Sequence, residues 1–161
     1  MDGWPNFFLG ELSAAAALAG LLFVSISVNQ ARILALGRMA DRGLEALAML
    51  LLVVIVASLP LVPRQPPRLL GAEVLAAGVS IMALLVRLQH VYLSGLDPAY
   101  RRPTLKMVWV NRLAVGLISL AGAILSYRGD WLGLYLLPPG ILLSIFGSGA
   151  SAWILLIEIN R

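Results

Sequence analysis

One face of the first apolar run carries side chains that could conduct ions. At about 100° per residue, positions spaced four and three residues apart share a helical face. The residues that share this face are Glu11, Ala15, Leu18, Leu22, Ser25, Asn29 and Arg32. The face is acidic at one end, apolar in the middle, and polar and then basic at the other end. Rings of carboxylates concentrate cations and apolar constrictions gate by dewetting, so this pattern is typical of a pore lining.

Such a pore requires several copies of the helix around a common axis, and therefore a homo-oligomer. Glu11 would then form an outer acidic ring, and Leu18 and Leu22 would form a hydrophobic constriction. The inner mouth would be polar and basic, with Ser25, Asn29 and Arg32 as its lining candidates. The alternative is that the carboxylate is merely solvated at the headgroups, while the polar side chains bond to neighbouring helices.

A second group of ionisable residues lies in or at the ends of the later apolar runs. An intramembrane charge costs at least ~2.5 kcal/mol, so each one needs a partner or a function. We expect an ion-paired belt near the inner surface, in which basic side chains pair with acids or snorkel to water. The candidates are Glu45, Arg87, His90, Arg112 and Glu158. Arg112 in particular is expected to be half-buried and paired with Glu45 or Glu158.

Few residues of this chain could support catalysis, disulfide formation or metal binding. It has no cysteine and a single histidine, which excludes disulfides and cysteine nucleophiles and leaves no metal site of the usual His/Cys type. The serines of the apolar runs have no acid–base partner near them in sequence. We therefore expect neither an enzyme nor a bound metal or cofactor.

The elements that must position these residues are membrane helices. Hydrophobic residues make up 60% of the 161-residue chain and charged residues 12%, against about a quarter charged in ordinary globular proteins. A helix needs ~20 mostly apolar residues to cross the hydrocarbon core. The sequence therefore predicts an all-α fold, a single transmembrane domain over residues 1–161. The five predicted spans are residues 7–36, 43–62, 69–93, 105–126 and 132–158.

Small residues and prolines punctuate these runs. Rows of small side chains let helix backbones approach closely, either within the chain or between copies. The rows include Ser13, Ala16, Gly20 and Ser27 in the first run, Gly116, Ser119 and Gly122 in the fourth, and Gly140, Ser144, Ser148 and Ala152 in the fifth. Pro138 and Pro139 interrupt the last run. Either they kink its helix, or the helix proper begins there and residues 132–137 form a separate turn.

Basic residues are distributed unequally between the predicted loops. Nine of the twelve Lys and Arg residues flank the loops after the first and third spans or the C-terminus, and three lie on the other side. The positive-inside rule then places the N-terminus outside and the C-terminus in the cytoplasm. The same distribution accounts for the net charge of +4 without a nucleic-acid partner. We expect a multi-pass protein of the inner (plasma) membrane, in contact with lipid.

The N-terminal fifth of the chain resembles a set of uncharacterised small bacterial membrane proteins. These begin with Trp-x-x-Phe-Phe and continue as a helix of the pattern Ala-x-x-Gly-Leu-x-Phe-Val-x-x-Ser-x-Asn. The matching positions here are Trp4, Phe7, Phe8, Ala17, Gly20, Leu21, Phe23, Val24, Ser27 and Asn29. The resemblance implies a bacterial polytopic membrane protein and no particular activity.

Three functions are compatible with these patterns. The leading hypothesis is a homo-oligomeric ion channel lined by the first helix. The second is a small transporter with a buried site near the Pro138–Pro139 break, where free backbone groups could bind a substrate or an ion. The third is a non-conducting accessory subunit that assembles with another membrane protein through its small-residue rows.

Overall fold

Five long apolar helices form the framework of the chain. A computed structural model describes residues 3–35, 39–94, 96 and 98–159, and across these ranges it contains helices and turns but no strand. The elements are α1 (Trp4–Val28), α2 (Gln30–Ala35), α3 (Met39–Ser58), η1 (Leu59–Leu61), α4 (Pro67–Leu93), α5 (Pro98–Arg128), η2 (Trp131–Leu136) and α6 (Leu137–Ile159). Five segments are long and apolar enough to cross a membrane, which confirms the all-α prediction and the number of candidate spans.

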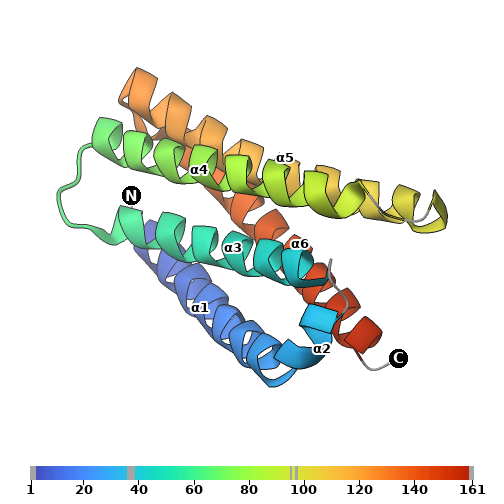
Figure 1. The fold of residues 1–161 in the computed structure, drawn as a ribbon. Helices are drawn as coiled ribbons and strands as arrows, with labels where there is room; N and C mark the ends of the chain where they lie inside the picture. Colours follow the sequence, from blue (N-terminus) through green and yellow to red (C-terminus); the bar gives the residue numbers. More distant parts are fainter. Residues whose placement is uncertain (1–2, 36–38, 95, 97, 160–161) are drawn as a thin grey trace.

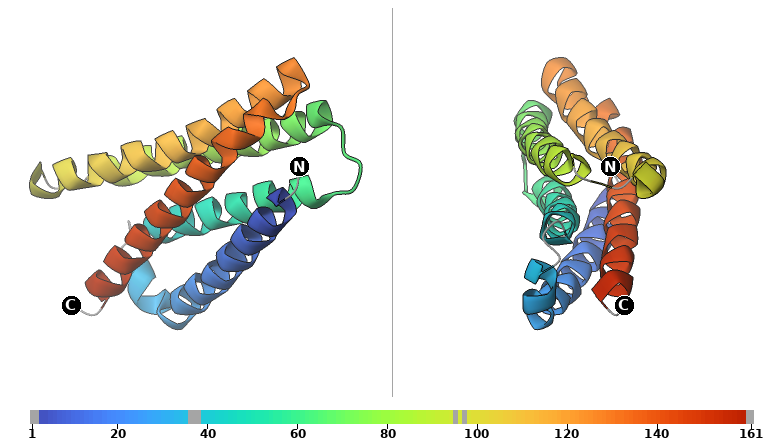
Figure 2. Two further views of the ribbon diagram at one scale, coloured as in Figure 1. Left: turned by 180° about the vertical axis from the view of Figure 1, so that it is seen from behind. Right: turned by 45° about the vertical axis from the view of Figure 1, so that its right-hand side comes forward.

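The long helices alternate in direction, so their connections gather at two ends. The N-terminus and the η1 connection lie at one end, on the left in Figure 1, which we call the N-terminal end. The other end holds α2, the α4–α5 connection and the end of α6, and we call it the α2 end. Helices α4 and α5 lie side by side along most of their length in every view (Figures 1 and 2). Helix α3 contacts α1, α4 and α6, whereas α1 packs mainly on α3.

Glycines bring α4 and α5 into close contact. A Cβ atom on Gly122 would lie 2.5 Å from the backbone nitrogen of Leu75 and 2.8 Å from the carbonyl oxygen of Gly71. A side chain on Gly71 would in turn collide with the backbone of Ser126. Close backbone approach replaces the hydrophobic driving force that lipid does not supply between membrane helices. These small residues therefore serve packing within the chain.

The helix boundaries explain the two interruptions in the apolar runs. Helix α1 ends at Val28, earlier than the predicted residue 36, because the Asn29 side chain donates to the Ser25 carbonyl at 2.9 Å and α2 then turns away. At the other interruption, α6 begins at Leu137. Pro138 and Pro139 thus occupy its first turn, where a missing N–H has no helical partner to lose. The preceding residues form the separate turn η2.

Candidate functional site

The most deeply buried ionisable side chain among the described residues is Glu45 in α3. It is 2% exposed. At 1.5 Å per residue it lies about 9 Å along the axis from the start of α3 and about 20 Å from its last residue, Ser58. It therefore lies within the candidate membrane span Ala40–Leu61, nearer the α2 end. An ionisable side chain inside a membrane span is by default a candidate functional site.

Three neutral donors from two other helices surround this carboxylate. Its Oε1 atom accepts hydrogen bonds from Gln89 Nε2 at 2.7 Å and from Asn111 Nδ2 at 2.9 Å. Its Oε2 atom accepts one from the Tyr92 hydroxyl at 2.8 Å. Gln89 and Tyr92 are three residues apart on α4, so they present their polar groups on the same helical face. The carboxylate thereby ties α3 to α4 and α5.

Two arginines flank the carboxylate without binding it. Arg112 Nε donates to Gln89 Oε1 at 2.7 Å, so the Gln89 amide stands between the guanidinium and the carboxylate. The guanidinium carbon of Arg112 also lies 5.9 Å from the centre of the Trp109 ring, and that of Arg42 lies 5.7 Å from the centre of the Tyr92 ring. The sequence predicted that Arg112 pairs with Glu45 or Glu158, and towards Glu45 the structure has a bridge through Gln89 in place of a direct ion pair.

A buried polar stripe on α6 faces the same group of residues. Ser144, Gly147, Ser148 and Ser151 share one side of that helix by their spacing, and all four are buried. A Cβ atom on Gly147 would collide with Asn111 Oδ1. Among the described residues, neither Asn111 Oδ1 nor Ser144 Oγ has a hydrogen-bond partner. Asn111 Oδ1 belongs to the amide whose nitrogen donates to Glu45, so this unpartnered oxygen lies beside the carboxylate shell.

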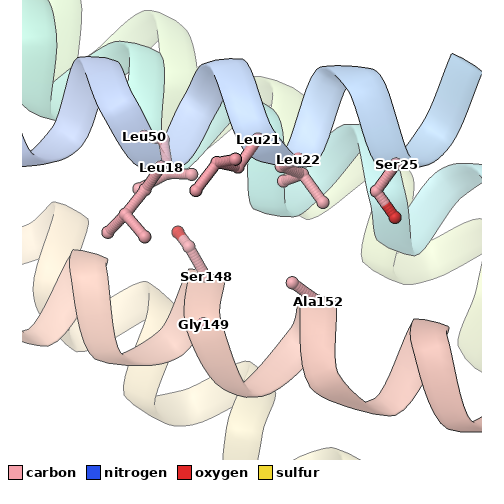
Figure 3. Close-up of a pocket in the computed structure, with 8 residues that line it drawn as sticks. All are labelled: Leu18, Leu21, Leu22, Ser25, Leu50, Ser148, Gly149 and Ala152. Atoms are coloured by element: carbon pink, nitrogen blue, oxygen red, sulfur yellow. The ribbon is translucent and has the colours of Figure 1, made fainter.

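An apolar cleft between α1 and α6 adjoins this stripe (Figure 3). Its volume is about 160 Å³, and its lining residues are Leu18, Leu21, Leu22, Ser25, Leu50, Ser148, Gly149 and Ala152. Three pore-lining candidates from the sequence therefore face a cleft inside one subunit. Leu22, 6% exposed, packs with Ala19, Ala46 and Leu50 of the same chain. Figure 3 shows the Ser148 side chain directed from α6 towards α1.

No known protein family, curated protein or solved structure matches this chain. The arrangement of its own residues is therefore the basis for assigning a function.

The remaining pore candidates do not lie on one continuous face. Glu11 is half-buried near the N-terminal end. Asn29 uses its amide to bind the Ser25 carbonyl, and Arg32 is exposed on α2, beyond the point where α1 ends. Because α2 runs in a different direction from α1, the four-three spacing no longer places Arg32 on the face of Leu18 and Leu22.

The predicted inner belt is also only partly assembled. Arg87 and His90 are exposed, whereas Arg112 is half-buried. The side chain of Glu158 lies outside the described residues. Within those residues no ion pair involves Glu45, and the ion pair that does occur joins Arg128 Nε to Asp130 Oδ2 at 3.1 Å, at the N-terminal end.

Sequence reasoning missed the three residues that hold the carboxylate. Gln89, Tyr92 and Asn111 are uncharged, whereas the predicted inner belt consisted only of acidic and basic residues. The available signal was the amide side chains of Gln89 and Asn111 within apolar runs, since a polar group in lipid requires a hydrogen-bond partner. Within the described residues there is no group of three or more His, Cys, Asp or Glu that could hold a metal ion.

Proposed function

We propose that this chain is a small cation-coupled transporter in which Glu45 binds the coupling cation inside the membrane. The observation that carries this proposal is the shell of neutral donors around a carboxylate that is 2% exposed. A carboxylate paired directly with arginine would have its charge neutralised. Here Gln89 keeps the Arg112 guanidinium one side chain away. The negative charge therefore remains available to a small cation that reaches it, which is the usual role of acidic groups in pumps and transporters.

The proposed site differs from the one that the prolines of α6 suggested. A Cβ atom on Gly140 would lie 2.8 Å from Ile118 Cγ1 and 3.1 Å from the Ala114 carbonyl oxygen. The backbone at Gly140, next to the two prolines, is thus packed closely against α5. The polar groups that converge in the bundle are instead those around Glu45.

We further propose that the α2 end faces the cytoplasm. The nine-to-three distribution of basic residues supports this orientation. The three on the less basic side are Arg64, Arg68 and Arg128, beside the connections of the N-terminal end. The resemblance of the first helix to small bacterial membrane proteins supports a bacterial inner membrane. Glu45 then lies in the cytoplasmic half of the bilayer.

A homo-oligomeric channel is the second candidate, and one observation favours it. Cβ atoms on Gly10 and Gly20 of α1 would meet no other atom of the chain within 4 Å, unlike those on Gly71 and Gly122. The small residues of α1 are therefore free for contact with another copy. Against this candidate, Leu22 is packed within its own subunit, so a constriction made by Leu22 would need α1 to separate from α3.

Flux through reconstituted protein tests both candidates. Purified protein in liposomes, with a pH-sensitive dye or radioactive sodium as the reporter, should admit cations under an imposed potential faster than empty liposomes. Glu45→Gln removes the charge and keeps the size, and we expect it to abolish this flux. Glu11→Gln is the matched control and should retain it. Normal flux through Glu45→Gln protein would refute the transporter, and loss of flux in Glu11→Gln protein alone would favour the channel.

A further inference from the structure

A pocket lies at the N-terminal end of the bundle, beside the connection from η1 to α4. Its volume is about 470 Å³, which is within the range of pockets that hold small ligands. Its walls come from α1, η1, the η1–α4 connection, α4 and η2. The lining includes Pro5, Leu61, Val62, Arg64, Leu70 and Trp131. Figure 1 shows the connection as the green segment that bulges away from the helices.

This pocket lies at the depth where the membrane surface is expected. Four candidate spans contribute to its lining, each with a residue within four positions of its end. These residues are Pro5, Leu61, Leu70 and Trp131, in the spans Trp4–Val28, Ala40–Leu61, Pro67–Leu93 and Trp131–Ile154 respectively. Tryptophan is enriched at the level of the lipid headgroups. The pocket is therefore expected beside headgroups and not in the middle of the hydrocarbon core.

The lining combines an apolar wall with a positive charge. Arg64 is the charged residue among the described residues that line the pocket. A second cavity of about 80 Å³ shares Pro5, Pro60 and Trp131 with it and has an entirely apolar lining. A ligand that matches both features is an amphiphile with a negatively charged head.

The charge of Arg64 is not neutralised within the part of the chain that the structure describes. Arg128, at the same end, is paired with Asp130, but no such ion pair involves Arg64. The Glu73 carboxylate accepts a hydrogen bond from Gln65, the neighbour of Arg64 in the pocket lining. A guanidinium group matches the geometry of a phosphate and binds it with two parallel N–H bonds. Arg64 is therefore suited to a phosphate headgroup.

The backbone at Arg64 has a conformation that is unusual for a residue with a side chain. Its φ angle is 60°, in the left-handed region. Pro63 directly precedes it and Pro66 follows in the same connection, and the proline rings restrict rotation of the chain there. Strained residues in rigid surroundings cluster at ligand-binding sites. The connection is thus a stiff loop that holds Arg64 beside the pocket before any ligand arrives.

We propose that this pocket binds an anionic phospholipid, whose phosphate pairs with Arg64 and whose acyl chain lies against the apolar wall. Basic pockets between membrane helices bind anionic headgroups in this way. A zwitterionic lipid carries its own ammonium group and brings no net charge for Arg64 to neutralise. Inorganic phosphate has no apolar part to contact Val62 or Trp131. The site is separate from Glu45 and does not depend on transport.

Thermal melts of the purified protein in detergent test the class of ligand. A ligand that binds only the folded state raises the melting temperature, by roughly 3–6 °C at about ten times its dissociation constant. We expect dioleoyl phosphatidylglycerol to produce this shift, and dioleoyl phosphatidylcholine or inorganic phosphate to produce little or none. No shift with phosphatidylglycerol, or equal shifts with the two lipids, would overturn the proposal. An equal shift with inorganic phosphate would identify a free anion as the ligand and overturn the lipid.

Native mass spectrometry of lipid-bound protein tests the role of Arg64. We expect the dissociation constant for phosphatidylglycerol to rise about tenfold in Arg64→Gln protein, equivalent to about 1.4 kcal/mol. Arg68→Gln is the matched control, because Arg68 is exposed at the start of α4 and does not line the pocket. Binding should be unchanged in this control. Equal losses in both variants would indicate a general attraction of basic residues for anionic lipid and would overturn the site.

Arg64→Gly separates loss of binding from loss of folding. Glycine adopts a positive φ angle without strain, so without lipid this variant should melt at the same temperature as the wild type or at a higher one. It lacks the guanidinium group, so we expect phosphatidylglycerol to raise its melting temperature no more than phosphatidylcholine does. A wild-type response of folded Arg64→Gly protein to phosphatidylglycerol would overturn the assignment of the headgroup to Arg64.

Discussion

The Tyr92 hydroxyl offers a direct measurement of how much the Glu45 network stabilises the bundle. Tyr92→Phe removes one donor to Glu45 Oε2 and leaves the ring, which Arg42 covers, in place. Hydrogen bonds to charged groups contribute ~1.5–3 kcal/mol. For a domain of this size, 1 kcal/mol corresponds to about 2–4 °C in melting temperature, so the expected decrease is roughly 3–12 °C.

The matched control is Tyr127→Phe, in which the same atom is removed from a side chain that is 89% exposed. Neither substitution changes the four tryptophans, so intrinsic fluorescence in detergent micelles follows the unfolding of both variants equally. We expect the control to melt within experimental error of the wild type. Equal melting temperatures for the two variants would contradict the assignment of Tyr92 to a buried charge-assisted bond.

A double-mutant cycle makes the prediction sharper, because the sign of the effect should change. In a Glu45→Leu background the Tyr92 hydroxyl has lost its acceptor and is a buried, unpaired polar group. Removing it there should be neutral or stabilising, since an unsatisfied buried donor is itself costly. The coupling between the two positions is then the difference between the two backgrounds. The same decrease in both backgrounds would show that Tyr92→Phe acts through packing and not through Glu45.

Two further predictions concern packing and orientation. Gly122→Ala should destabilise the protein by ~1–3 kcal/mol, because its Cβ would meet the backbone of Leu75 and Gly71. The control is Gly116→Ala, where a Cβ meets nothing within 4 Å, and it should be neutral or stabilising by up to ~1 kcal/mol. Comparable losses of stability in thermal melts of the two variants would disprove close α4–α5 packing at Gly122. Single cysteines placed at Gly3 and Arg161 of this cysteine-free chain should be labelled by an impermeant reagent from opposite sides of the membrane, Gly3 from outside, and labelling of both from one side would refute the five-span topology.

The sequence by itself determined the number and type of the long apolar segments. In lipid every backbone N–H and C=O group needs a hydrogen-bond partner within its own segment. An apolar run of this length can therefore cross the membrane only as a helix. Even local details followed from residue type. Pro138 and Pro139 could only interrupt a helix or begin one, and the structure selects the second. The end of α1 at Val28 was predicted less well, because Asn29 continues the helical spacing and yet ends the helix through its own side chain.

Tertiary structure alone decided which polar groups meet. The donors to Glu45 come from positions 44, 47 and 66 residues away in the chain. Whether they converge depends on how each helix is rotated about its axis, and that rotation is set by close packing such as the contact between Gly71 and Gly122. A periodic pattern shows which residues share a face, but not what that face meets. The sequence pattern therefore predicted Leu22 as part of a pore constriction, whereas in the folded chain Leu22 packs against α3.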